Sequence, residues 1–284
     1  MTPPVVVGVD GSESALRAVD LAAEEAALRG VPLRVVHASL WERYEGTSLT
    51  PGHGRPSERL TAEKILRTAE QRANLRRPEV EVSLDVLPEE PEYALVREGR
   101  EACLLVLGTR GRGGLAELLL GSVSLAVAAR AGCPVIVVRG EPSARGRVVV
   151  GIGEKGTDSA ALDFAFKEAR LRHAGLDAVR AWRCPAREST DIPLLAGEPA
   201  RLHEQHAVEA LERALKDAPG DVDLNRRTAE GSPRTVLLDA ARDADLLVVG
   251  ARRHPGHFGL QLGRVAHAVL HHSACAVAVV PEVG

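Results

Sequence analysis

The chain has 284 residues, about twice the length of a common domain. Apolar residues make up 45% of it and charged residues 26%, which excludes a disordered, collagen-like or disulfide-dense chain. The net charge of −3 and the aromatic content of 2% argue against a nucleic-acid partner, because binding would need a basic surface or stacking platforms.

The first residues and the cysteines indicate the compartment. The apolar run Val5–Val7 follows Met-Thr-Pro-Pro without a basic region, so we do not predict a signal peptide. The most apolar long stretch, 118–138, contains Arg130 and a Gly-Cys-Pro break, which favours a helix followed by a strand over a membrane span. The cysteines show no C-x-x-C spacing, which argues against a zinc ribbon and suits a reducing environment. We therefore expect a cytoplasmic protein with no membrane partner.

The first half of the chain alternates apolar strands with amphipathic helices. We predict strands over residues 5–9, 33–38, 80–87, 104–107 and 135–138. Between them we predict a helix from the Ser12 turn to Gly30, and further helices over 58–76, 91–102 and 122–131. This alternation predicts an α/β fold, a mainly parallel sheet with helices on both faces.

The second half repeats the first. PVVVGVD at 4–10 returns as RVVVGIG at 147–153, LLVLGTRG at 104–111 as LLVVGARR at 246–253, and CPVIVV at 133–138 as CAVAVV at 275–280. The offset is 142 or 143 residues each time, about half the chain. We therefore predict two tandem domains, over 1–140 and 147–284, joined by a linker of small and polar residues. Strands of the second are expected near 148–152, 176–182, 222–228, 246–249 and 276–280.

A glycine-rich segment follows the fourth predicted strand. It begins Gly108-Thr-Arg-Gly111-Arg-Gly-Gly and reaches a helix at Gly121-Ser122. Glycines let backbone N–H groups approach a ligand, and a helix N-terminus adds partial positive charge, so the segment suits a phosphate chain. Neither a Walker A run nor a G-x-G-x-x-G after the first strand is present. By itself the loop is equally well explained as a tight turn.

Asp10 gives a second indication of a ligand. It stands at the carboxyl end of the first strand, where open α/β sheets bind their ligands. If the fourth strand lies beside the first, the carboxylate faces the glycine loop and accepts hydrogen bonds from an adenine amino group or a sugar hydroxyl. The alternative role is to cap the following helix, which Ser12 or Ser14 can also do.

Three segments, VVVGVDGS at 5–12, GTRGRGGLAELLLGS at 108–122 and CPVIVVRG at 133–140, match a known family pattern. Through them the chain resembles the universal stress protein family in its tandem two-domain form, and the middle segment resembles the family's ATP signature. The resemblance implies two open-sheet domains of the adenine nucleotide alpha hydrolase-like kind. Each would be a five-stranded parallel sheet in the order 3-2-1-4-5. The last strands, near 135–138 and 277–280, would pair with each other, and association into a homodimer is left open.

The resemblance also implies a site for ATP at the carboxyl ends of the first and fourth strands. Val9 and Asp10 would contact the adenine, and Ala38 would line the same pocket. The residues around the ribose and phosphates would be Gly108, Arg110, Gly111, Gly121, Ser122, Val123 and Ser124. Mg²⁺ would enter with the phosphates, since no obvious acidic pair is available to hold a metal.

The second half departs from this signature. Gly153 stands in place of Asp10, and two arginines, Arg253 and Arg264, replace Gly111 and Ser122. We therefore predict that the second domain does not bind ATP in the family mode. The arginines either receive another anion or fill the crevice themselves, and we favour filling.

The sequence supports nucleotide binding better than catalysis. We expect an ATP-binding regulatory or stress-response module with little or no hydrolysis, and we assign no catalytic residue. One alternative is a slow ATPase or a self-phosphorylating protein, for which Ser122 and Ser124 are the nearest hydroxyls. Another is an interaction scaffold that binds no nucleotide.

Histidines and loop aromatics have both a chemical and a structural interpretation. His267 and His271 share one face of the last helix, and His203 and His206 share a face of an earlier one. No motif places a carboxylate or thiolate with either pair, so we expect solvated or capping side chains and no metal site. The aromatic residues within 41–44 either cover the nucleotide or pack against the core, and we favour packing.

Overall fold

The computed structural model describes residues 2–40, 56–109, 120–140, 144–153, 160–184, 198–252 and 262–282. They divide into two compact units, one reaching to Arg139 and the other beginning at Gly140. Five residues discussed above lie outside the described ranges, namely Trp41, Tyr44, Arg110, Gly111 and Arg253.

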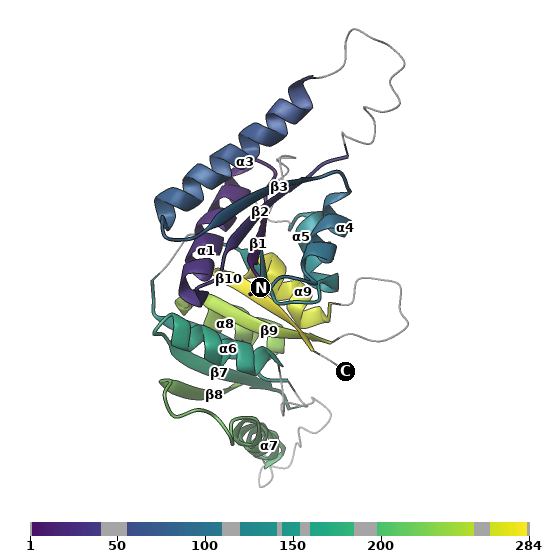
Figure 1. Ribbon diagram of the computed structural model, residues 1–284. Coiled ribbons are helices and arrows are strands. Elements are labelled where there is room, and N and C mark those ends of the chain that lie inside the picture. Colours follow the sequence, from purple (N-terminus) through teal and green to yellow (C-terminus); the bar gives the residue numbers. More distant parts are fainter. Residues whose placement is uncertain are drawn as a thin grey trace. The chain divides into compact units, whose positions relative to one another are not determined.

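The first unit is built on a parallel sheet (Figure 1). Its strands are β1 (Val5–Gly8), β2 (Leu33–Ala38), β3 (Val82–Leu87), β4 (Leu104–Gly108) and β5 (Val135–Val138). They lie in the order β3-β2-β1-β4-β5, which confirms the predicted order 3-2-1-4-5. In the centre, Val5 of β1 is aligned with Leu33 of β2 and with Leu104 of β4. Every residue of β4 is buried, as expected for a strand covered on both faces.

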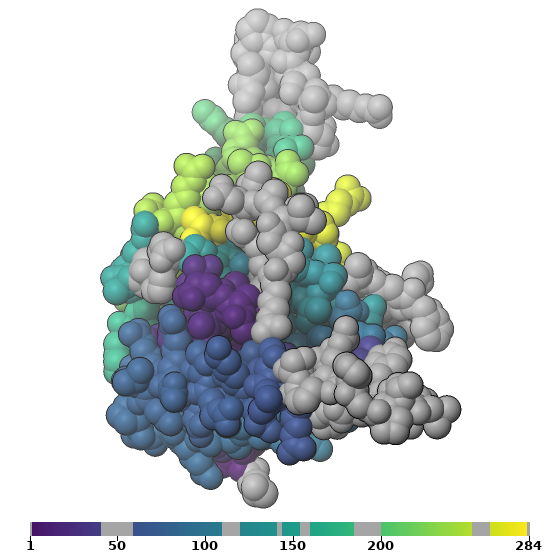
Figure 2. All heavy atoms as spheres, turned by 90° about the horizontal axis from the view of Figure 1, so that it is seen from above, coloured from purple at the N-terminus to yellow at the C-terminus, as the bar shows by residue number. Residues whose placement is uncertain are grey.

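Helices cover both faces of this sheet. They are α1 (Glu13–Arg29), α3 (Pro56–Arg76), α4 (Pro91–Glu98) and α5 (Ser122–Arg130). α1 and α3 pack together on one face, and α4 and α5 on the other (Figure 1). Arg72 of α3 donates to both carboxylate oxygens of Asp20 on α1, at 2.8 and 2.6 Å. Figure 2 looks onto the blue atoms of α3, which form an outer surface of this unit. The helix predicted over 91–102 ends earlier, at Glu98, with Gly99 as its C-cap residue.

The second unit repeats this architecture. Its strands are β6 (Arg147–Gly151), β7 (Gly175–Trp182), β8 (Leu224–Glu230), β9 (Leu246–Arg252) and β10 (Ala276–Glu282). They lie in the order β8-β7-β6-β9-β10, which is again 3-2-1-4-5. Its helices are α6 (Ala160–Leu171), α7 (Glu198–Ala214), α8 (Pro233–Ala240), the short 3₁₀ helix η2 (Ala241–Asp243) and α9 (Arg264–His272). Across the described ranges, no helix is long and apolar enough to cross a membrane.

A buried ion pair in the first helix of one unit recurs in the other. Glu25 of α1 is fully buried and pairs with Arg29 one turn later. Glu168 of α6 is also fully buried and pairs with Arg172 at 3.0 Å. Both pairs occupy equivalent positions of the repeat, 143 residues apart. Since a buried carboxylate loses its hydration, each depends on the neighbouring guanidinium.

The Arg29→Met substitution should destabilise the first unit by about 3–5 kcal/mol, because it leaves the buried Glu25 carboxylate without the guanidinium. The double variant Glu25→Met with Arg29→Met should recover most of this stability, since no buried charge remains. Urea unfolding followed by far-ultraviolet circular dichroism measures both variants. Equal losses in the two would show that packing, not charge, makes the pair necessary.

The end of β4 is held against the starts of α1 and α5. Ser14 Oγ accepts a hydrogen bond from the Thr109 backbone N–H at 2.7 Å and lies 3.1 Å from Thr109 Oγ1. Ser124 Oγ donates to the carbonyl oxygen of Gly108 at 2.7 Å. All three hydroxyl side chains are buried. A Cβ on Gly108 would lie 2.7 Å from backbone atoms of Ser14, so a side chain at this position would force α1 to move.

The Gly108→Ala substitution should therefore lower stability by about 1–3 kcal/mol, as expected for overpacking against backbone. Gly250→Ala in the second unit is the matched control. There the added methyl would meet Glu282 Oε1 at 2.6 Å, at the end of a flexible side chain, so the loss should be smaller. Urea unfolding of both variants tests the difference, and an equally large loss at Gly250 would contradict the explanation.

Candidate functional site

A cavity of about 280 Å³ lies at the carboxyl ends of β1, β2 and β4. The predicted site residues that line it are Val9, Asp10, Ala38, Gly108, Gly121, Ser122, Val123 and Ser124. The two remaining predicted residues, Arg110 and Gly111, lie outside the described ranges. The structure therefore brings together every predicted site residue that it describes.

Apolar residues that the sequence analysis did not assign complete the cavity. They come from the strand ends and from α1 and α4, and they are Gly8, Ala15, Val36, Pro91, Leu95 and Leu107. We predicted a helix that begins at Pro91, but the sequence did not show which face of that helix would reach the site. The cavity thus has an apolar wall and a polar edge.

The Asp10 carboxylate is fixed at this edge by the turn that follows it. Its Oδ1 accepts a hydrogen bond from the Ser12 N–H at 2.9 Å. Gly11 between them has a φ of 83°, in the left-handed region that favours glycine. Ser12 in turn caps α1, because its Oγ accepts from the Ala15 N–H at 3.2 Å. The helix cap is therefore Ser12, and Asp10 holds the turn beside the cavity.

The N-terminus of α5 reaches the opposite edge of the cavity. Its N-cap residue is Gly121, which has no side chain with which to cap the first turn. Backbone N–H groups at such a helix start, together with the helix dipole, attract an anion. Ser124 positions this helix through its bond to Gly108, whereas the Ser122 side chain is exposed. The site thus presents N–H donors to an anion on one side and a carboxylate on the other.

The His37 side chain, on β2, contacts the residue that follows β1. Its Nδ1 lies 2.7 Å from the carbonyl oxygen of Val9, and the Val9 N–H donates to the Val36 carbonyl at 2.9 Å. His37 was not among the predicted site residues. A comparison of the two repeats would have found it, because its counterpart is Arg180.

The second unit has a larger cavity, of about 630 Å³, at the corresponding strand ends. Ile152, Gly153 and Val265 line it in the places of Val9, Asp10 and Val123. We expected arginines to fill this crevice. For Arg264 the structure differs, because this residue is exposed and is not among the described residues that line the cavity. Arg253 lies outside the described ranges.

A carboxylate of the protein itself lies over Gly250, the counterpart of Gly108. The two oxygens of Glu282 accept hydrogen bonds from the N–H groups of Ala160 and Ala161, each at 3.3 Å. A Cβ on Gly250 would lie 2.6 Å from Glu282 Oε1. The first turn of α6 therefore already holds a negative group.

The paired histidines lie in different settings. His203 and His206, which we expected to be solvated or capping, line the cavity of the second unit. His267 and His271 stand one turn apart on α9 with ring centroids 4.5 Å apart. In the part of the chain that the structure describes, no group of three or more His, Cys, Asp or Glu side chains could hold a metal ion.

Comparison with known proteins shows which family has this sequence pattern. The model of the universal stress protein family matches residues 1–139 and again residues 144–281. A universal stress protein of Mycobacterium tuberculosis strain H37Rv is 31% identical over 292 aligned residues, which cover 94% of this chain and 93% of that protein. A second one from the same strain is 30% identical and covers 93% of this chain and 92% of its own.

A solved structure shares the fold over nearly the whole chain. A universal stress protein from Archaeoglobus fulgidus DSM 4304 matches 99% of both chains with a TM-score of 0.66 and 16% identity. Another from Archaeoglobus fulgidus, solved in complex with dAMP, is 31% identical and covers 49% of this chain and 100% of its own, with a TM-score of 0.36. The family model and the mycobacterial relatives extend over nearly the whole sequence, so this chain belongs to the universal stress protein family.

Proposed function

We propose that the first unit binds ATP in the cavity at the ends of β1, β2 and β4, and that the nucleotide sets the state of a regulatory or stress-response module. The observation that carries the proposal is the gathering of predicted residues from separate segments around one cavity. Gly108 and Gly121, at the two ends of the glycine-rich segment, line the same cavity as Asp10. The apolar wall suits the base and the carboxylate suits the sugar. The α5 N-terminus suits the phosphates.

The size and chemistry of the cavity suggest how ATP would lie. A volume of about 280 Å³ is at the small end for ligand pockets, so it would take the nucleoside part. The base would contact Val36 and Leu107, and the Asp10 carboxylate would accept from its amino group or from a sugar hydroxyl. The phosphates would then extend toward the first turn of α5 and the loop that contains Gly111. Mg²⁺ would bind through the phosphates themselves.

We propose little or no hydrolysis at this site. Asp10 is the one carboxylate among the described residues that line the cavity, and it is hydrogen-bonded to the Ser12 N–H. The Ser124 hydroxyl donates its hydrogen bond to the Gly108 carbonyl, which favours a positioning role over attack on a phosphate. A slow ATPase and a self-phosphorylating protein remain the alternatives that a kinetic test must separate.

We further propose that the second unit does not bind ATP in this manner. Gly153 offers no carboxylate to a base or sugar, and Glu282 places negative charge where the start of α6 meets Gly250. A polyphosphate near that point would be repelled. The domain limits of 1–140 and 147–284, the pairing of the last strands and the cytoplasmic location stay predictions.

Protein purified without added nucleotide, then denatured and chromatographed, should release one ATP per chain. The Asp10→Ala variant should bind ATP at least about tenfold more weakly, since a hydrogen bond to a charged group contributes roughly 1.5–3 kcal/mol. Asp163→Ala removes an exposed carboxylate of α6 and is the control. Calorimetric titration gives the affinities. Unchanged binding in Asp10→Ala would reject the site, and a yield of two nucleotides per chain would reject the proposal for the second unit.

The Gly111→Arg variant copies Arg253 of the second repeat into the first and should abolish ATP binding. Its urea unfolding midpoint should match that of the wild type, because Gly111 falls between the end of β4 and the start of α5. Single-turnover mixing with ATP tests the alternatives at the same time. Release of both ADP and inorganic phosphate from the wild type but not from Gly111→Arg would identify a slow ATPase. Release of ADP with the phosphate retained on Ser122 or Ser124 would identify self-phosphorylation.

A further inference from the structure

The two cavities differ in charge at two pairs of equivalent positions. In the first unit the end of β1 bears Asp10 and the end of β2 bears His37. In the second unit the same two positions hold Gly153 and Arg180. A carboxylate has been lost and a guanidinium gained within one pocket. The two cavities therefore offer different charges at these strand ends.

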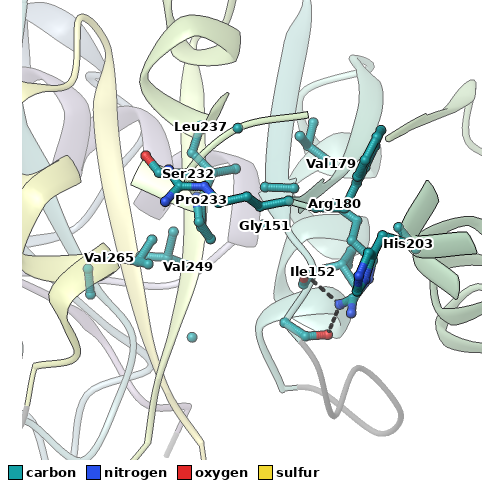
Figure 3. A pocket seen from close by; sticks show the side chains of 18 of the residues that line it. Gly151, Ile152, Val179, Arg180, His203, Ser232, Pro233, Leu237, Val249 and Val265 are labelled. Carbon is teal, nitrogen blue, oxygen red and sulfur yellow. Dashed lines mark hydrogen bonds between the residues drawn. The ribbon is translucent and has the colours of Figure 1, made fainter. Parts of the chain in front are cut away.

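Arg180 is held at the base of this cavity by backbone. Its Nη1 donates to the carbonyl oxygens of Gly153 at 2.6 Å and of Ile152 at 3.4 Å, bonds that are drawn as dashed lines in Figure 3. This is the position that His37 takes beside Val9 in the first unit. The Nε atom of Arg180 is buried, and no hydrogen-bond partner for it exists among the described residues. The guanidinium thus has a fixed orientation and at least one donor whose hydrogen bond is not made.

Further cationic or protonatable side chains line the same cavity. Arg183 follows β7 and is exposed, and His203 and His206 come from α7. Figure 3 shows His203 beside Arg180. Glu282 is the one carboxylate among the described lining residues, and both of its oxygens accept from N–H groups of α6. Both arginines among the described lining residues lie in β7 or just after it, so positive charge is concentrated at the β7 side of the cavity.

The rest of the wall is apolar. Val179, Leu237, Val249 and Val265 contribute aliphatic side chains, and Trp182 adds an aromatic ring. The volume of about 630 Å³ lies within the range of pockets that hold small organic molecules. A ligand that fills it would bury an apolar body and present one anionic group to the arginines.

We propose that the second unit binds a small organic anion that carries a single carboxylate or phosphate monoester on an apolar body. Arg180 and Arg183 hold the anionic group, with His203 beside it, and the body lies against Leu237 and Val249. Glu282 keeps a second charged group away from the opposite end, so a polyphosphate is excluded. This proposal is independent of nucleotide binding by the first unit.

Three matched probes test it on the full chain by calorimetric titration: 2-naphthoate, 2-naphthyl phosphate and the neutral 2-naphthamide. We expect at least one anion to bind at least about tenfold more tightly than the amide, as an ionic hydrogen bond would give. Tighter binding of naphthoate would identify a carboxylate ligand, and tighter binding of naphthyl phosphate a phosphate monoester.

Variants locate the binding. Arg180→Met should weaken binding of the anion at least about tenfold without changing binding of the amide. His37→Met alters the equivalent position of the first unit and should have no effect. Because Arg180 also bonds to backbone carbonyl groups, Arg183→Met provides a second variant at an exposed residue. It should weaken binding of the anion and leave the urea unfolding midpoint unchanged. The nucleotide-site variant Gly111→Arg should bind the probe normally, which separates this proposal from the one for ATP.

Three results would overturn the proposal. One is the absence of anion binding at millimolar concentration. Another is equal affinity for the anions and the amide, which would show an apolar cavity without charge recognition. The third is anion binding that both arginine variants retain but His37→Met loses, which would place the probe in the first unit.

Discussion

The close approach of Gly108 to the backbone of Ser14 is the constraint on which the first unit depends. With no side chain between them, the N-terminus of α1 comes into hydrogen-bond contact with the end of β4. Ser124 ties α5 to the same point. The ends of β1 and β4 and the starts of two helices are thereby brought around one small volume, and that volume is the cavity.

The second unit keeps the glycine and changes what lies against it. Ala251 and Ala266 replace Thr109 and Ser124, so two of the buried hydroxyls are gone. In their absence a carboxylate, that of Glu282, lies over Gly250 and bonds to the first turn of α6. The strand order is unchanged, which shows that one scaffold tolerates two different chemistries at its strand ends.

Much of the fold followed from the sequence because it depends on local pattern. The apolar runs predicted the strands, and the repeat of 142 or 143 residues predicted a second copy of the architecture. The order of the strands could not be derived from the alternation and came from the family resemblance. The position of Asp10 opposite the start of α5 then followed, since parallel strands end at the same edge of a sheet.

The contacts that distinguish the two cavities were not predicted, because they join side chains to backbone far away in the sequence. Arg180 bonds to carbonyl groups near Ile152, and Glu282 bonds to the start of α6. We instead expected Arg264 to fill the second crevice, and it is exposed. A position-by-position comparison of the repeats would have pointed to Arg180 and Glu282. The groups to which they bond could be found only from the structure.

The bond from Glu282 to the start of α6 also bears on how the chain folds as it leaves the ribosome. α1 carries its own cap in the residue just before it, Ser12, so this helix can be finished soon after it emerges. The backbone N–H of Ala160 instead bonds to a carboxylate 122 residues further along the chain, so this bond forms only after that residue has been synthesised. The first unit can thus mature while translation continues, and the second acquires its last stabilising contact only after β10 has been synthesised.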